Sequence, residues 1–191
     1  MENQQKFCIC CGEEVPYNKI IRDGNLELTC AYCGFVLDVK MEAEQTAASC
    51  IITVDDSRMT REFLEKMLNK SDLAETVIAT EGGAEFLAAF TKRLAEKQPV
   101  DLAILDLEMP VMDGITVARA LRSVEEMYHT TPTPILVFSV KKCDDALKQQ
   151  LGLFAPASYI NKGSSSDPAQ LKKRIDKLVT YLLNKRHAAK T

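Results

Sequence analysis

Five short runs of apolar residues occur along the chain after residue 49, each bounded by polar residues. The runs are unbroken rather than alternating, which is typical of parallel strands that helices cover on both faces. They lie at residues 50–54, 76–79, 102–105, 135–138 and, more weakly, 158–160. The pattern therefore predicts a parallel sheet of five strands.

The segments between these runs space apolar residues three or four positions apart, so that they share one face of a helix. The clearest sets are Phe63, Leu64, Met67 and Leu68, then Phe86, Leu87, Phe90 and Leu94, and finally Leu171, Ile175, Leu178, Val179 and Leu182. Helix starts are marked by Asp113, and by Ser166 or Asp167 before Pro168, because such residues cap or fit the first helical turn. Strands and helices alternate as (βα)5, and right-handed crossovers then predict a doubly wound α/β domain.

Five of the seven cysteines stand within the first 33 residues, in two C-x2-C-G units that are 18 residues apart. Two residues between thiolates allow one turn to direct both sulfur atoms at an ion, and the following glycine tolerates positive φ. The expected ligands of a structural, tetrahedral Zn2+ site are Cys8, Cys11, Cys30 and Cys33. A catalytic zinc site usually employs histidine, yet His129 and His187 lie far along the chain.

The spacer between the cysteine units contains two short β-prone stretches, residues 19–22 and 26–29, on either side of an Asp-Gly-Asn turn. The segment resembles a zinc ribbon over about 35 residues. A unit of this size buries little apolar surface, so metal binding is expected to supply its stability. Two alternatives stay open: Cys10 could replace Cys8 or Cys11 as a ligand, or the cysteines could be redox-active thiols.

Length and charge narrow the range of functions. The chain has 191 residues, 46% of them hydrophobic, with a net charge of −3, which suits one globular domain with an appendage. Residues 1–46 carry four basic and eight acidic side chains, which argues against nucleic-acid binding by the ribbon and favours protein docking. No apolar run is long enough to span a membrane and no signal-peptide pattern is present, so we expect a cytoplasmic protein.

Polar residues follow four of the five predicted strands, where the carboxyl ends of parallel strands meet at one edge of the sheet. They are Asp55 and Asp56 after the first strand, Asp106 after the third, Ser139 after the fourth and Lys162 after the fifth. Three converging carboxylates repel one another and need a hard cation, for which Mg2+ is the natural choice. A lysine and a hydroxyl beside them are suited to binding phosphoryl oxygens.

These residues, together with the Asp-x-x-Met-Pro-x-x-Asp-Gly loop at 106–114, resemble the receiver domain of two-component response regulators over residues 49–186. The resemblance is specific because separated motifs match in the same order along the chain. It implies a flavodoxin-like fold for the (βα)5 unit. It also implies that Asp106 accepts a phosphoryl group from a histidine kinase or histidine phosphotransferase and forms an acyl phosphate.

The resemblance further implies how Mg2+ is bound. Asp56 and Asp106 would be ligands together with the backbone carbonyl of Glu108, while Asp55 would act largely through water.

The remaining site residues receive roles by the same resemblance. Lys162 would pair with the phosphoryl group, Ser139 would hydrogen-bond one of its oxygens, and Tyr159 stands at the position of the family's switch aromatic residue. Phosphorylation would draw the Ser139 hydroxyl inward and open space for Tyr159 to change rotamer. The face expected to change comprises residues 141–152, 157–161 and 167–186, and it would control a partner or a dimer.

Two positions depart from the family pattern. Gly163 stands where proline is usual, and Val140 stands where alanine or glycine is usual, so that its branched side chain would narrow access to Asp106. Glu108 and Lys141 are also expected to be able to pair across the site and obstruct the attacking water. We therefore predict slow loss of the phosphoryl group.

The predicted domains are a zinc ribbon at 1–39, a linker or frayed helical bridge at 40–48, a receiver at 49–186 and a tail at 187–191. Because the chain ends at the fifth helix, we expect no separate output domain, no enzymatic activity beyond slow autodephosphorylation, and signalling through protein contacts, with a phosphorylation-dependent homodimer as one form. Three alternatives are a nucleic-acid regulator acting through the ribbon, a small phosphohydrolase, and a docking scaffold independent of phosphorylation. The motif order disfavours the phosphohydrolase, because in such enzymes the nucleophile follows an early strand.

Overall fold

The computed structural model describes residues 5–22, 25–38, 47–163 and 167–188, which form two sheets. The larger sheet is parallel, with strand order β5-β4-β6-β7-β8. Its strands are β4 (Ala48–Val54), β5 (Ala74–Thr80), β6 (Leu102–Leu105), β7 (Ile135–Ser139) and β8 (Ala157–Asn161). All five expected strands are present, and the predicted doubly wound parallel sheet is confirmed.

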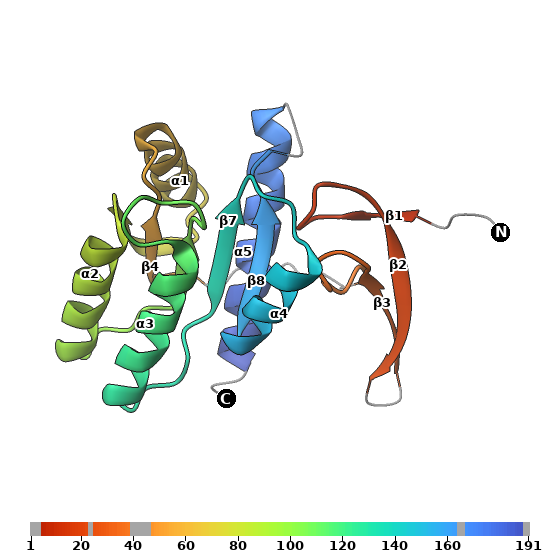
Figure 1. Ribbon diagram of the computed structural model, residues 1–191. Coiled ribbons are helices and arrows are strands. Elements are labelled where there is room, and N and C mark those ends of the chain that lie inside the picture. Colours follow the sequence, from red (N-terminus) through yellow and green to blue (C-terminus); the bar gives the residue numbers. More distant parts are fainter. Residues whose placement is uncertain (1–4, 23–24, 39–46, 164–166, 189–191) are drawn as a thin grey trace.

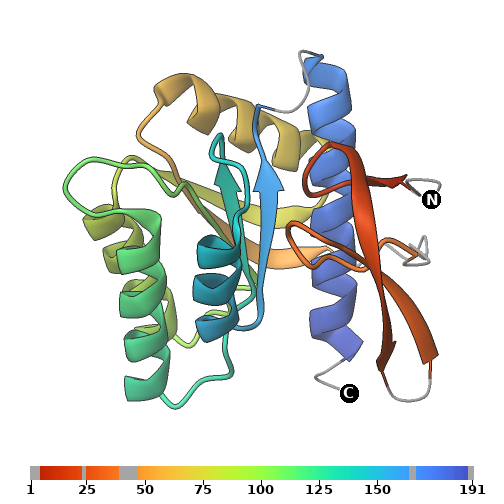
Figure 2. The ribbon, with the colours of Figure 1, turned by 45° about the vertical axis from the view of Figure 1, so that its right-hand side comes forward.

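Helices cover both faces of this sheet. They are α1 (Arg58–Lys70), α2 (Gly83–Ala95), α3 (Gly114–Met127), α4 (Asp145–Leu153) and α5 (Pro168–Ala188). Helices α1 and α5 lie on one face, and α2, α3 and α4 lie on the other (Figures 1 and 2). The expected caps of α3 and α5 are formed, since Asp113 accepts a hydrogen bond from the Thr116 N–H and Asp167 accepts one from the Ala169 N–H. The alternative cap Ser166 lies outside the described residues.

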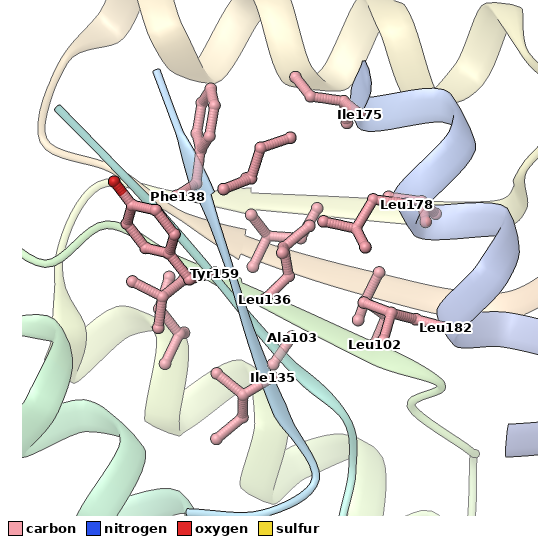
Figure 3. Close-up of a cluster of buried hydrophobic side chains, with 14 of the residues drawn as sticks. Leu102, Ala103, Ile135, Leu136, Phe138, Tyr159, Ile175, Leu178 and Leu182 are labelled. Carbon is pink, nitrogen blue, oxygen red and sulfur yellow. The ribbon is translucent and has the colours of Figure 1, made fainter. Parts of the chain in front are cut away.

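The hydrophobic core explains why the apolar runs are unbroken. Every residue of β6 and β7 is buried, because helices cover both faces of these central strands. On one face, Ile175, Leu178 and Leu182 of α5 point toward the sheet residues Leu102 and Leu136 (Figure 3). Full burial of one such side chain contributes about 1.5–3 kcal/mol. The sheet is therefore held rigidly, and so are the residues at its carboxyl edge.

The smaller sheet is antiparallel, in the order β1-β2-β3. Its strands are β1 (Gln5–Cys8), β2 (Glu13–Arg22) and β3 (Asn25–Cys30). The hairpin of β2 and β3 confirms the expected pair of strands, although both are longer than the sequence indicated. Strand β1 was not predicted, because Gln5 and Lys6 interrupt any apolar pattern. Figure 1 shows this sheet beside β8, α4 and α5, on the opposite side of the larger domain from α2.

The boundaries between the parts differ slightly from expectation. Of the expected linker or helical bridge at 40–48, residues 40–46 lie outside the described residues. Strand β4 begins at Ala48, inside the expected linker, and α5 runs to Ala188, past the expected end of the domain at residue 186. Among the described helices, none has the length and apolar character needed to cross a membrane.

Candidate functional site

The polar residues that follow the strands lie together at the carboxyl edge of the larger sheet. Strands β4 and β6 end level with each other, because Val54 pairs with Leu105, and this places Asp55 beside Asp106. The Lys162 Nζ lies 2.6 Å from Asp55 Oδ2 and 2.9 Å from Asp106 Oδ2. One ammonium group therefore bridges two carboxylates that come from different strands.

The carboxylate cluster fits a magnesium ion. Asp55 is 1% exposed, and burial raises the pKa of its carboxyl group while the nearby Lys162 lowers it. One oxygen each of Asp55, Asp56 and Asp106 lies within 4.8 Å of the others, and Asp56 is exposed to solvent. A cluster of carboxylate oxygens with one side open to solvent suits Mg2+, because this ion retains several of its water ligands. The Glu108 N–H lies 3.4 Å from Asp106 Oδ1, so this backbone borders the cluster, and its carbonyl remains a predicted ligand.

The loop after Asp106 is closed by close backbone packing at Gly114. The Gly114 N–H donates to the Leu107 carbonyl at 3.0 Å, and a Cβ atom on Gly114 would lie only 2.1 Å from the Asp106 carbonyl oxygen. No side chain fits in this gap, which is the physical reason for the Asp-Gly end of the motif. The cap formed by Asp113 then starts α3 directly after the loop.

The hydroxyl and aromatic residues of the site are buried and connected. Ser139 is fully buried at the end of β7, and its Oγ accepts a hydrogen bond from the Lys141 N–H at 3.1 Å. Its carbonyl accepts one from the Lys162 N–H at 2.8 Å. Tyr159 is 3% exposed and donates its hydroxyl to the Lys141 carbonyl at 2.5 Å. The expected switch residue is thus turned inward and holds the loop that follows Ser139.

Asn161 is a candidate functional residue that the sequence pattern does not indicate. Its Nδ2 donates to the Tyr159 hydroxyl at 2.7 Å and lies 3.2 Å and 3.3 Å from the carbonyl oxygens of Val140 and Lys141. Its Oδ1 accepts from the Gly163 N–H at 2.8 Å. A polar residue at the end of a strand gives only a weak signal in sequence, since it is equally consistent with a simple strand terminus.

The expected pairing of Glu108 with Lys141 is not formed in the described part of the chain. The Lys141 Nζ instead lies 3.8 Å from Asp144 Oδ2, because α4 begins immediately after this loop and brings Asp144 closer. Val140 is largely exposed. Of the two reasons for expecting slow turnover, only the bulk of Val140 therefore remains.

The four expected zinc ligands lie together at one end of the small sheet. The Sγ atoms of Cys8 and Cys33 are 3.6 Å apart, and those of Cys11 and Cys30 are 3.7 Å apart. Zn–S bonds of about 2.3 Å in a tetrahedron require sulfur atoms about 3.8 Å apart, so the cluster fits Zn2+ closely. All four sulfur atoms are within 4.8 Å of one another.

The two cysteine turns have the same backbone geometry. In each turn the second cysteine's N–H lies 3.4 Å from the first cysteine's Sγ, as with Cys11 and Cys8. The glycine after each turn donates its N–H to the carbonyl of the first cysteine, with φ of 75° at Gly12 and 76° at Gly34. Cys10 is buried but lies outside the group of four, and burial raises the pKa of its thiol.

Comparison with known proteins identifies the larger domain. A family model of the response regulator receiver domain matches residues 51–176. The chain belongs to this family. The expected resemblance to receiver domains is therefore confirmed. The polar cluster described above lies at the carboxyl edge of the sheet of this receiver domain.

Curated relatives match mainly the receiver domain. A protein-glutamate methylesterase/protein-glutamine glutaminase of Photobacterium profundum is 30% identical over 149 residues, which cover 74% of this chain and 35% of the relative. A protein of the same description from Alkalilimnicola ehrlichii is 33% identical over 135 residues, covering 69% of this chain and 32% of the relative. The chain thus spans about a third of the length of these relatives.

Solved structures agree on the fold. The chemotaxis protein CheY4 of Vibrio cholerae is 26% identical with a TM-score of 0.53, and the match covers 69% of this chain and 98% of that one. The phosphorylated cyanobacterial phytochrome response regulator RcpA is 23% identical with a TM-score of 0.59, covering 73% and 96%. Nearly the whole of each receiver is matched, while about a quarter or more of this chain lies outside the match.

Proposed function

We propose that this chain is a two-component response regulator in which Asp106 is phosphorylated by a histidine kinase or a histidine phosphotransferase. The observation that carries the proposal is the bridge from Lys162 to Asp55 and Asp106 at the carboxyl edge of the sheet. A partly buried cation held against the acceptor carboxylate is suited to stabilising the added negative charge of a phosphoryl group.

The geometry supports direct transfer to Asp106. An Asp106 carboxylate oxygen attacks phosphorus, a P–O bond forms, and the P–N bond to the donor imidazole breaks with its electron pair left on nitrogen. Charge spreads over the phosphoryl oxygens, so positive groups and hydrogen-bond donors stabilise the transition state. Lys162 and the Ser139 hydroxyl supply these from neighbouring strand ends. Mg2+ held by Asp55, Asp56, Asp106 and the Glu108 carbonyl would add further positive charge.

We propose that Cys8, Cys11, Cys30 and Cys33 bind one structural Zn2+. The support is the match between the sulfur spacings and a tetrahedral shell. Cys10 is not needed to complete the shell, and a closed set of four thiolates has no open position for a substrate.

Output through protein contacts is the function that the ribbon surface favours. The hairpin of β2 and β3 exposes apolar side chains at its end, with Ile21 77% and Leu26 64% exposed. Exposed apolar groups on an acidic module suit a protein partner better than a phosphate backbone. A binding titration with duplex DNA at increasing salt concentration tests the alternative of nucleic-acid binding. That alternative requires binding that weakens steeply as the salt concentration rises.

The proposal is tested by native mass spectrometry of the full chain with Mg2+, before and after addition of acetyl phosphate. We expect one bound zinc and one phosphoryl adduct, with the adduct absent in Asp106→Asn. Asp72→Asn is the matched control, because Asp72 is exposed and its φ of 50° is a conformation that asparagine tolerates. This control should be phosphorylated like the wild type.

Other outcomes of the same experiment identify the alternatives. Zinc without any adduct, even when a kinase is supplied, would indicate a docking scaffold that works without phosphorylation. Continuous release of phosphate from para-nitrophenyl phosphate that Asp106→Asn abolishes would instead indicate a phosphohydrolase. An acyl phosphate that lasts only minutes or less would contradict the predicted slow autodephosphorylation.

A further inference from the structure

The zinc-ribbon module is packed on the receiver face formed by α4, β8 and α5. Figure 2 shows β2 crossing in front of α5, and Figure 1 shows the same module beside β8 and α4. This face contains the residues expected to change on phosphorylation, at 141–152, 157–161 and 167–186. The module therefore covers the surface through which the receiver would be expected to signal.

Backbone hydrogen bonds attach the first cysteine turn to the edge of the sheet. β8 is an edge strand, and its Asn161 N–H donates to the Cys10 carbonyl at 2.8 Å. Arg174 of α5 donates from Nε to the Ile9 carbonyl at 2.7 Å and from Nη2 to the Cys10 carbonyl at 2.9 Å. The same Nη2 lies 3.2 Å from the Asn161 carbonyl. The turn thus pairs with the carboxyl end of this edge strand.

The contact with the ribbon forms the buried environment of the Arg174 side chain. The Arg174 side chain is only 4% exposed. Arginine side chains are seldom this buried unless they have hydrogen-bonding or charged partners. Its contacts with carbonyls come from both the ribbon and β8, so neither part alone supplies this environment. The turn that presents Ile9 and Cys10 is fixed at both ends by the cluster cysteines Cys8 and Cys11. Arg174 therefore needs a formed cysteine turn opposite it.

Contacts on either side of this junction widen the docked area. Phe35 meets Tyr181 of α5 edge to face, with ring centroids 5.7 Å apart. Lys142 Nζ lies 2.9 Å from Glu13 Oε1. A Cβ atom on Gly34 would lie 3.1 Å from Lys148 Cε of α4, so the second cysteine turn also approaches the receiver closely. Both cysteine turns of the module therefore lie against the receiver.

Asn161 connects the docked module to the switch residue. Its backbone N–H donates a hydrogen bond to the Cys10 carbonyl. Its side-chain Nδ2 donates to the Tyr159 hydroxyl and lies beside the Val140 and Lys141 carbonyls. Undocking would leave the edge of β8 without its backbone partner. Tyr159 would then lose a neighbouring contact that helps to keep its side chain buried.

We propose that the zinc ribbon is an intramolecular cap on the α4–β8–α5 face, that it docks only when the cysteine cluster holds metal, and that docking holds Tyr159 and Asn161 in their buried arrangement. A partner that binds this face must first displace the ribbon. The metal dependence rests on the proposed zinc site, whereas the docking contacts do not depend on phosphorylation of Asp106.

Hydrogen–deuterium exchange of the full zinc-loaded chain, without any phosphodonor, tests the cap. We compare Arg174→Met, which removes the junction contacts, with Lys177→Met, which removes an exposed cation from the same helix. Arg174→Met should increase exchange in residues 5–14 and 157–163 by about tenfold or more, because local opening exposes these amides. Lys177→Met should exchange like the wild type. Equal exchange in Arg174→Met and wild type would overturn the cap.

A ribbon-side variant covers the case in which Arg174→Met unfolds the receiver. Phe35→Ser removes the contact with Tyr181, and Leu26→Ser is its control at the exposed end of the hairpin. Only Phe35→Ser should increase exchange in α5 and β8. Equal exchange in the two variants would again contradict docking through this face.

Metal removal separates the cap from the proposed zinc site. EDTA treatment should increase exchange in α4, β8 and the outer surface of α5, and leave the central strands β4 and β6 unchanged. Native mass spectrometry of the same samples counts the zinc. A chain that never binds zinc but keeps the junction protected would overturn the metal dependence and the zinc proposal together. A zinc-loaded chain whose junction exchanges freely would overturn the cap alone.

Discussion

The ribbon and the receiver are held together by different chemistry. In the described part of the ribbon, the fully buried residues are mainly cysteines, and Val15 is the one buried aliphatic side chain. The receiver buries large side chains throughout, among them Ile51, Ile52, Phe86 and Phe90. A small sheet without an apolar core is expected to depend on the proposed Zn2+, whereas the larger sheet is stabilised by burial of apolar surface. Metal availability should therefore act on one module and leave the other folded.

The sharpest test of this difference is a ligand substitution. Cys11→Ser removes one of four thiolates, and structural zinc contributes about 10–16 kcal/mol in small zinc modules, so we expect metal content well below one per chain and loss of structure in the ribbon. Metal analysis and hydrogen exchange of residues 5–38 measure both effects.

Cys50→Ser is the matched control for that experiment. Cys50 is fully buried in β4 and lies outside the cysteine cluster, so the same exchange of sulfur for oxygen should cost the receiver about 1–3 kcal/mol and leave the zinc content unchanged. Equal loss of zinc from Cys11→Ser and Cys50→Ser would contradict the conclusion that metal stabilises the ribbon while apolar burial stabilises the receiver.

Core truncation in the receiver should give the converse result. Phe86 is fully buried in α2, stacked on Phe90 with centroids 6.1 Å apart and on the far side of the sheet from the ribbon. Phe86→Ala should reduce the free energy of unfolding by about 3–5 kcal/mol, measured by urea denaturation. Zinc content should stay at one per chain in the absence of denaturant. Loss of zinc from this variant would show that the modules fold as one unit.

A smaller effect is expected where the receiver backbone is crowded. In Gly114→Ala the new Cβ overlaps the Asp106 carbonyl oxygen, so the loop must shift at a cost of about 1–3 kcal/mol. The shift moves Asp106, the proposed phosphoryl acceptor, and we expect slower adduct formation with acetyl phosphate. Gly152→Ala in α4 is the control, since its Cβ meets nothing within 4 Å and alanine favours the helix by about 1 kcal/mol. Phosphorylation of Gly114→Ala at the control's rate would argue against this packing role.

The smallest effect is expected at a helix cap. The Asp113 Oδ1 accepts from the Thr116 N–H at 2.7 Å, so Asp113→Ala should reduce the free energy of unfolding by about 1 kcal/mol. Thermal and urea denaturation measure the change. Asp113→Asn retains the capping oxygen and should keep most of the stability, and neither variant should alter zinc content.

Much of the receiver could be predicted from sequence because its signals are local. Unbroken apolar runs indicate buried strands, and a strand end fixes where the next residue lies, so the apolar pattern is enough to place Asp55, Asp106 and Lys162 together. The paired C-x2-C-G units work in the same way, since each turn is built from four adjacent residues. Strand β1 escaped prediction because it pairs only with β2 and has no apolar pattern of its own.

The amino-acid sequence by itself determined the two modules, the strand and helix order of the receiver, the hairpin of the ribbon and the residue types of both sites. Only the tertiary structure decided that the ribbon lies on the α4–β8–α5 face, and that Asn161 and Arg174 join it to the end of β8 beside Tyr159. The bond from Asn161 to Cys10 spans 151 positions along the chain, and Arg174 lies 165 positions from Ile9. No local periodicity encodes such pairings, because they depend on how two separately formed surfaces fit together.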